Sequence, residues 1–212
     1  MKIALVGATG NIGRQIARHA LAHGHHVTAV VRSEKDLPAE LAGAQLAIAA
    51  LDDTDALAAV IAGHDVLASA YGPRPDDDIA QIATVADQLV AAARQAKVPR
   101  VVVVGGAGSL EIAPGVQLVD TPDFPAAYKP YALAAREALK RLQAVDDLDW
   151  TFFSPAAEIG PGDERGQYRV QAKTFLADAS GHSRISYADY GAAFVAELEA
   201  GKYPKQIITA AY

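Results

Sequence analysis

Three glycines at regular spacing follow the first apolar run of the chain, in the segment Gly7-Ala8-Thr9-Gly10-Asn11-Ile12-Gly13. The run from Lys2 to Val6 is typical of a buried strand, and the residues after Gly10 have the apolar spacing of a helix. In such a turn one glycine permits the tight bend, one admits a ligand to the backbone and one allows close helix packing. Free N–H groups at the helix start suit a phosphate. The predicted pyrophosphate-binding residues are Gly7, Thr9, Gly10, Asn11, Ile12 and Gly13. The alternative is a tight packing turn without a ligand.

The second predicted strand, His26 to Val31, is followed by a cation instead of an acid. A site that prefers NAD carries an acid here, which binds the 2′-hydroxyl of the adenosine ribose. Arg32 and Ser33 stand there instead, and a planar guanidinium beside a hydroxyl suits a 2′-phosphate. The pair favours NADP(H), and NAD(H) stays allowed because sites of dual specificity also carry arginine. The alternative is an ordinary solvated arginine.

Further candidate cofactor contacts follow the third and fourth predicted strands. Asp52 could accept a hydrogen bond from the adenine amino group, or it could belong to a helix-capping cluster with residues 53–55. The segment Ala70-Tyr71-Gly72 stands at the carboxyl end of the fourth strand. Open α/β sheets bind ligands at such ends, so we expect backbone contact with the cofactor there.

Apolar runs alternate with helix-like patterns along most of the chain. This alternation predicts an α/β fold, a doubly wound Rossmann-type parallel sheet with helices on both faces. The predicted strands are Lys2 to Val6, His26 to Val31, Gln45 to Ala49, Asp65 to Ser69, Arg100 to Val104 and Trp150 to Phe153. The predicted helices are Asn11 to His23, Asp76 to Ala96 and Ala126 to Ala144.

Beyond Phe153 the alternation weakens. The expected elements are a loop over Ser154 to Gly166, short strands near Tyr168 to Val170 and Ser183 to Ser186, a helix over Ala188 to Glu199 and a returning strand over Gln206 to Ala210. We predict one NAD(P)-binding domain over residues 1–212, in which residues 154–187 form a small lobe over the substrate.

The composition of the chain limits the kinds of partner that we expect it to bind. The 212 residues are 51% hydrophobic, carry a net charge of −6 and include no cysteine. Thiolate catalysis, disulfides and iron–sulfur clusters are therefore excluded, and a cytoplasmic location is expected. No basic patch or membrane segment is evident, so we expect a small-molecule acceptor, no nucleic acid and no membrane, and a homodimer is allowed. His23, His25 and His26 have no carboxylate at ligand spacing, so we interpret them as loop histidines and predict no metal site.

The chain resembles the atypical short-chain dehydrogenase/reductase superfamily, in its NmrA-like and NAD(P)H-flavin reductase-like branch, close to the biliverdin reductase B type. The resemblance is carried by the segments Gly7 to Gly13, Val30 to Ser33, Val104 to Leu110 and Ser154 to Gly160. It implies a Rossmann fold, NADP(H) binding, and hydride transfer to flavins, quinones or similar conjugated acceptors. Flavin would then be a substrate, not a bound prosthetic group.

The chain departs from that pattern at the expected proton donors. Many members of the superfamily use a Tyr-x-x-x-Lys pair, whose lysine lowers the pKa of the tyrosine. Here Tyr128 is followed four residues later by Ala132, and Tyr131 by Ala135. The absence of the tyrosine–lysine pair disfavours alcohol or ketone chemistry. It also weakens the interpretation of the chain as a sugar-nucleotide epimerase or dehydratase.

Three catalytic candidates remain. Gly106 occupies the position of a serine in the relatives, which leaves Ser109 as the nearest hydroxyl, for the nicotinamide amide or substrate. Tyr128 could stack or donate a proton, and Glu158, where biliverdin reductase B has a histidine, could contact substrate. The alternatives are that Ser109 is a turn serine, that Tyr128 belongs to the packed first turn of a helix and that Glu158 is a solvated loop glutamate.

These features predict an NADPH-dependent oxidoreductase, for which hydride transfer to a conjugated acceptor needs mainly stacking and exclusion of water. The long segment Gly105 to Pro125 is expected to form a lid or a substrate wall. The alternative function is a non-catalytic NADP(H)-binding redox sensor of the NmrA-like type, which the missing tyrosine–lysine pair suits equally.

Overall fold

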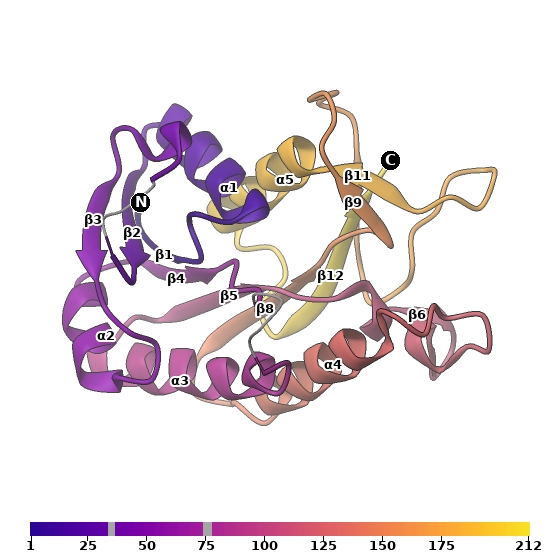
Figure 1. Cartoon of the computed structure of the whole chain (residues 1–212), viewed down its shortest axis with the longest axis horizontal. Coiled ribbons are helices and arrows are strands. Elements are labelled where there is room, and N and C mark those ends of the chain that lie inside the picture. Colours follow the sequence, from indigo (N-terminus) through magenta and orange to yellow (C-terminus); the bar gives the residue numbers. More distant parts are fainter. Residues whose placement is uncertain (34–36, 74–77) are drawn as a thin grey trace.

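The computed structural model describes residues 1–33, 37–73 and 78–212. Within these residues the chain forms an eight-stranded central sheet (Figure 1). The parallel strands are β1 (Lys2–Val6), β2 (His26–Val31), β3 (Gln45–Ile48), β4 (Val66–Ser69), β5 (Arg100–Val104), β8 (Asp149–Ser154) and β12 (Gln206–Ala211). β10 (Arg169–Ala172) joins one edge antiparallel to β12. The strand order is β10-β12-β8-β5-β4-β1-β2-β3, so the winding direction reverses between β1 and β4.

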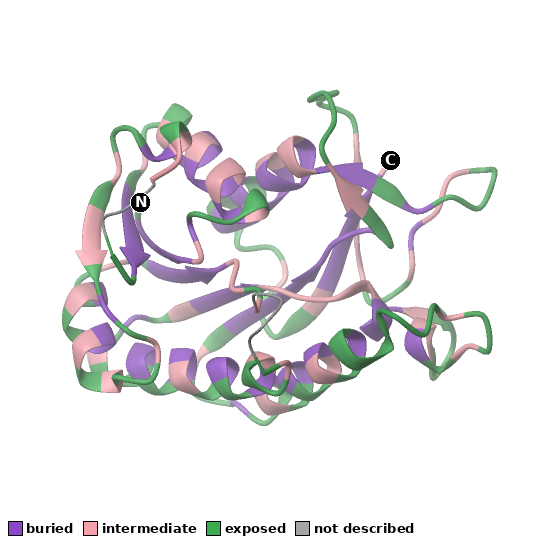
Figure 2. Ribbon diagram, in the orientation of Figure 1, coloured by how far each residue is buried: buried purple, intermediate pink, exposed green. Residues whose placement is uncertain are grey.

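Helices cover both faces of this sheet (Figure 1). The helices are α1 (Asn11–Ala22), α2 (Thr54–Ile61), α3 (Gln81–Ala96), α4 (Lys129–Gln143) and α5 (Tyr187–Ala200). α1 and α5 pack together on one face, and α2, α3 and α4 form the layer on the other. The central strands β1, β4 and β5 are buried along most of their length (Figure 2), which explains why they appear in the sequence as continuous apolar runs.

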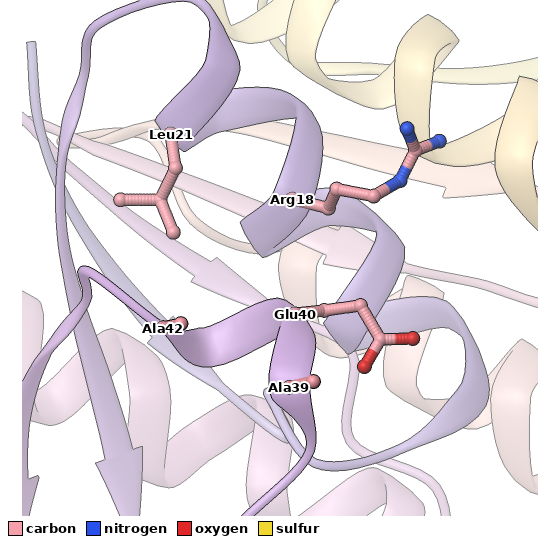
Figure 3. Close-up of a pocket in the computed structure, with 5 residues that line it drawn as sticks. All are labelled: Arg18, Leu21, Ala39, Glu40 and Ala42. Atoms are coloured by element: carbon pink, nitrogen blue, oxygen red, sulfur yellow. The ribbon is translucent and has the colours of Figure 1, made fainter.

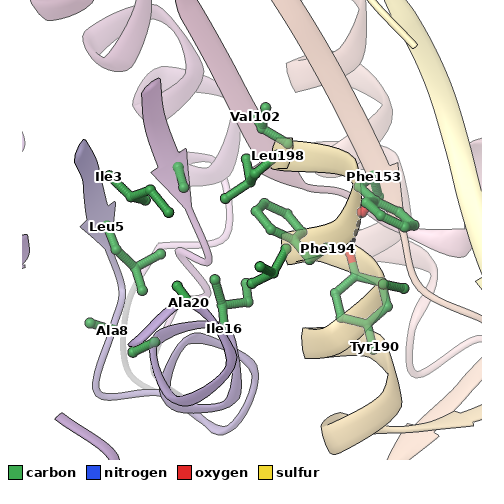
Figure 4. Close-up of a cluster of buried hydrophobic side chains, with 14 of the residues drawn as sticks. Ile3, Leu5, Ala8, Ile16, Ala20, Val102, Phe153, Tyr190, Phe194 and Leu198 are labelled. Atoms are coloured by element: carbon green, nitrogen blue, oxygen red, sulfur yellow. Dashed lines mark hydrogen bonds between the residues drawn. The ribbon is translucent and has the colours of Figure 1, made fainter. Parts of the chain in front are cut away.

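Aliphatic side chains and the rings of Phe153, Tyr190 and Phe194 fill the core between the sheet and the α1–α5 layer (Figure 4). The rings of Phe153 and Phe194 stack with centroids 5.7 Å apart, and the ring of Tyr190 lies 5.2 Å from that of Phe153. The Tyr190 hydroxyl is buried and donates a hydrogen bond to the Phe153 carbonyl oxygen at 2.5 Å. Because Phe153 is the penultimate residue of β8, this hydrogen bond holds α5 against the end of that strand.

The predicted α/β fold and its six main strands are confirmed, but two helices begin later than predicted. α3 begins at Gln81 instead of Asp76: residues 76 and 77 lie outside the described residues, and the Asp78 carboxylate accepts a hydrogen bond from the Ala80 N–H in a turn before the helix. α4 begins at Lys129 instead of Ala126. Pro130 has no N–H to bond the Ala126 carbonyl, so a helix that began at Ala126 would lack its first α-helical hydrogen bond.

The predicted short strands near Tyr168 to Val170 and at Ser183 to Ser186 correspond to β10 and β11. Sequence patterns missed three other short strands in the two long connections. Between β5 and α4 lie β6 (Glu111–Ala113) and β7 (Val116–Gln117), joined at Gly115, whose φ is +76°. Within the predicted substrate lobe, β9 (Glu158–Gly160) pairs in parallel with β11 (Arg184–Ser186). β10 lies in the main sheet, so part of that lobe is continuous with it. Among the described residues, no helix has both the length and the apolar content to cross a membrane.

Candidate functional site

A cleft of about 1880 Å³ runs across the carboxyl ends of the central strands. Residues from the ends of β2, β1, β4, β5 and β8 line it, and these five strands span four spacings, or about 19 Å. The reversal of winding between β1 and β4 lies at its middle. Open α/β sheets bind ligands at such a switch point, so the fold itself marks this cleft as the candidate site.

The glycine turn forms the floor of the cleft, and its three glycines have different roles. Gly7 has φ +72°, and a Cβ there would lie 2.5 Å from the Ala70 carbonyl oxygen. A Cβ on Gly13 would lie 2.1 Å from the Gly7 carbonyl oxygen. A Cβ on Gly10 meets only that oxygen, at 3.4 Å, on a residue that lines the cleft. Gly7 and Gly13 therefore permit the turn, whereas Gly10 leaves room for a ligand.

The start of α1 offers hydrogen-bond donors to that space. Its N-cap is Gly10, no side chain caps the helix and no acid lies in its first turn. Among the described residues, no acceptor meets the backbone N–H groups of Asn11, Ile12 and Gly13, whereas the Arg14 N–H already bonds Gly10. Three free donors at a helix N-terminus beside an open glycine fit a pyrophosphate. All the predicted turn residues line the cleft except Gly13, which is buried behind it.

The predicted adenosine-binding residues lie at one end of the cleft. Arg32, Ser33 and Asp52 line it, and all three are exposed. Arg32 forms no ion pair or hydrogen bond with any residue that the structure describes, so none of these residues competes with a ligand for its guanidinium. The helix-capping role falls to Asp53, whose Oδ1 accepts a hydrogen bond from the Ala56 N–H at 2.9 Å. The carboxylate of Asp52 is thus not the cap of α2.

The ends of β4, β5 and β8 line the cleft on the other side of the switch point. The segment Ala70-Tyr71-Gly72 lines it as predicted, and the Tyr71 hydroxyl donates to Gln81 at 3.1 Å. A Cβ on Gly105 would lie 2.1 Å from the Phe152 ring, so the residue that follows β5 must be a glycine. Ser154 Oγ donates to the Gly106 carbonyl at 3.0 Å and ties the ends of β5 and β8 together. Sequence reasoning missed this buried serine.

Ser109 does not lie in the cleft, contrary to the predicted catalytic role. It ends a short 3₁₀ turn, is 3% exposed, and is not among the lining residues. Its buried hydroxyl has no hydrogen-bond partner among the described residues. The turn from Gly106 to Leu110 directs it into the protein instead of toward the strand ends, which sequence spacing could not show.

We expect Ser109→Ala to leave ligand binding and turnover unchanged and to raise the free energy of unfolding by about 1 kcal/mol, because it removes an unsatisfied buried hydroxyl. The matched control is Ser154→Ala, which deletes a buried hydroxyl that does have a partner and should lower stability by about 1 kcal/mol. Thermal unfolding of both variants measures the difference. A loss of turnover in Ser109→Ala with the fold intact would restore its catalytic role.

The other end of the cleft carries aromatic side chains and few charges. Tyr128 and Glu158 both line it, as predicted, and both are exposed. Three further aromatic residues that sequence reasoning did not select also line the cleft: Phe124, Tyr131 and Tyr187. Ala132 and Ala135, which replace the lysine of a tyrosine–lysine pair, are nearly buried and line the same wall. This end therefore offers flat apolar contact and carries no tyrosine–lysine pair.

The loop after β9 is anchored from behind by a buried carboxylate. Asp189 is fully buried and accepts hydrogen bonds from the Arg165 N–H at 3.0 Å, the Gly166 N–H at 2.8 Å and the Tyr212 hydroxyl at 2.7 Å. Burial raises the pKa of Asp189, but these hydrogen bonds and that of Ser186 outweigh it, so the pKa is lowered. Glu164 of the same loop pairs with Arg18 at 2.6 Å. The loop beside Glu158 is thus held to α1 and α5.

A smaller depression of about 380 Å³ lies between α1 and the 3₁₀ turn Ala39–Leu41 (Figure 3). Its charged residues already have partners. Arg18 bonds Gln15 and Glu164, and Glu40 lies 3.8 Å from Arg14. The depression therefore offers no free polar group of its own, and the large cleft remains the candidate site.

A doubly wound sheet with an uncapped glycine turn at its switch point defines the class of Rossmann-type dinucleotide-binding proteins. The chain belongs to the NAD(P)H-binding family, whose family model matches residues 7–200. The resemblance inferred from the sequence is confirmed at this level.

Three solved structures are similar over the whole chain. A candidate exported protein of Burkholderia pseudomallei is 51% identical with a TM-score of 0.93, and the match covers 100% of both chains. A candidate epimerase of Bacteroides thetaiotaomicron is 37% identical with a TM-score of 0.90, covering 100% of this chain and 96% of that one. A candidate NADH-flavin reductase of Streptococcus pneumoniae is 33% identical with a TM-score of 0.88, covering 100% and 99%.

Proposed function

We propose that the protein is an NADPH-dependent oxidoreductase that reduces a flavin, a quinone or a similar conjugated small molecule. The observation that carries the proposal is the asymmetry of the cleft. The exposed guanidinium of Arg32 stands at one end, and an aromatic wall without a tyrosine–lysine pair stands at the other. The similarity to a candidate NADH-flavin reductase supports the same class of reaction.

In this proposal each part of the cleft has a defined task. The N–H groups at the start of α1 bind the pyrophosphate, and Arg32 with Ser33 binds the 2′-phosphate. Reduced nicotinamide supplies a hydride when bound. Tyr128 and the neighbouring aromatic rings hold a flat acceptor by stacking and exclude water. Glu158, exposed at the same wall, contacts the acceptor or passes it a proton from solvent.

The cofactor assignment is tested with Arg32→Ala. Losing a charged hydrogen bond to phosphate costs about 1.5–3 kcal/mol, so we expect NADPH to bind roughly 10- to 150-fold more weakly. NADH lacks the phosphate, and its affinity should change less than about threefold. Arg32→Lys keeps the charge without the planar fork and should fall between. Fluorescence titration of both cofactors measures this, and equal losses for NADPH and NADH would contradict the assignment.

Turnover separates the proposed enzyme from the sensor. Purified protein is mixed with NADPH and a panel of FMN, riboflavin and small quinones, and NADPH oxidation is followed by absorbance. Oxidation that depends on both protein and acceptor supports the reductase. Tight NADPH binding without oxidation on the whole panel would contradict it and favour the non-catalytic NADP(H) sensor.

A further inference from the structure

Two histidines and one glutamate meet far from the cleft, where α1 and α5 end side by side. His23 and His25 flank Gly24, whose φ of +77° turns the chain from α1 into β2. Glu199 lies in the last turn of α5. His23 Nδ1 and His25 Nε2 lie 2.9 and 2.8 Å from the same oxygen, Glu199 Oε1. The carboxylate that the sequence spacing lacked thus comes from 174 residues along the chain from His25.

The arrangement has the donors and nearly the dimensions of a transition-metal site. The three ligand atoms all lie within 4.8 Å of one another. A tetrahedral Zn²⁺ with bonds of about 2.0–2.1 Å separates its ligands by about 3.3 Å, so each nitrogen must move about 0.5 Å away from the carboxylate oxygen. Two imidazoles and one carboxylate suit Zn²⁺, Ni²⁺ or Cu²⁺ and disfavour Mg²⁺ and Ca²⁺.

The cluster is preorganised and open to solvent. The packing of α1 against α5 fixes the backbone that carries all three ligands. The side chains of His23 and Glu199 are 49% and 37% exposed, and that of His25 is 12% exposed. An ion can therefore enter from solvent and keep a water ligand. The other ring nitrogen of His25, Nδ1, lies 3.3 Å from the Met1 amino nitrogen, which leaves Nε2 toward Glu199.

We propose that His23, His25 and Glu199 form a surface site for a divalent transition-metal ion, with Zn²⁺ as its representative. The site lies at the end of the sheet where β2 begins, opposite the strand ends that form the cleft. A bound ion would join the end of α1 to the end of α5. It would therefore act on the stability of this helix layer and not on the reaction.

The test uses untagged protein, freed of metal by a chelator and titrated with Zn²⁺ by calorimetry. We expect one Zn²⁺ per chain. At a free Zn²⁺ concentration a hundredfold above Kd, Tm should rise by roughly 5–10 °C. His23→Ala and the isosteric Glu199→Gln should each weaken Zn²⁺ binding at least ~10-fold. In other metal sites, replacing a residue that only hydrogen-bonds to a ligand already weakens metal binding by that factor. His26→Ala, an exposed neighbour outside the cluster, should bind like the wild type.

Visible absorption of the Co²⁺-loaded protein gives an independent readout, because a tetrahedral site with nitrogen and oxygen ligands produces a band that His23→Ala should abolish. Circular dichroism confirms that the variants are folded. Zn²⁺ affinity unchanged in both His23→Ala and Glu199→Gln would overturn the proposal. So would competition by millimolar Mg²⁺, which would indicate a carboxylate surface instead of this cluster.

Discussion

Gly10→Ala should give a folded protein that has lost most of its affinity for NAD(P)H, whereas Gly13→Ala should lose both affinity and stability. At Gly10 the added methyl faces the cleft and meets only the Gly7 carbonyl oxygen, at 3.4 Å. It displaces the pyrophosphate from the donors of α1, and losing one or two charged hydrogen bonds weakens binding roughly 10- to 150-fold.

At Gly13 the added methyl would lie 2.1 Å from the Gly7 carbonyl oxygen and 2.9 Å from the Ala8 Cα. Backbone cannot rotate away as a side chain can, so α1 must shift from the turn, at a cost of about 3 kcal/mol or more. Cofactor titration and thermal unfolding of both variants check the contrast. The interpretation of Gly10 as the ligand-facing glycine fails if Gly10→Ala binds NADPH like the wild type.

The second large effect concerns the anchor of the loop after β9. Asp189→Asn keeps the shape of the side chain but replaces one oxygen by an NH₂ group. Either orientation sets this group against a donor, because Oδ1 faces the Gly166 N–H and Oδ2 faces the Arg165 N–H and the Tyr212 hydroxyl. We expect a loss of about 3 kcal/mol and a Tm lower by roughly 6–12 °C. Asp163→Asn, an exposed residue of the same loop, should change stability by less than about 0.5 kcal/mol.

The pH dependence of this effect follows from the lowered pKa of Asp189. A carboxyl with a lower pKa in the native state stabilises the fold above its unfolded pKa of about 3.9. That stability is lost as the pH falls through the native pKa. The Tm difference between wild type and Asp189→Asn should therefore be largest near neutral pH and shrink below about pH 4. Thermal unfolding from pH 7 to pH 3 measures it, and a constant difference would show that the charge of Asp189 contributes nothing.

Local sequence patterns located the strands and the glycine turn between β1 and α1 well because short-range rules decide both. β1, β2 and β5 have the predicted bounds, since a strand buried on both faces is a continuous apolar run that ends where glycine or polar residues begin. Helix starts were less accurate. Pro130 and the turn at Asp78 make α4 and α3 begin several residues later than predicted.

The candidate site also has one part that the sequence could predict and one part that it could not. The sequence by itself located the residues of the proposed phosphate-binding end, because a strand, a glycine turn and a helix adjoin along the chain and Arg32 follows the next strand. Only the tertiary structure decided that Ser109 points away from the cleft, that Phe124, Tyr131 and Tyr187 share its wall, and that Glu199 meets His23 and His25. These contacts join segments far apart in sequence. The packing of helices and long connections sets them, and the local spacing of apolar residues does not encode that packing.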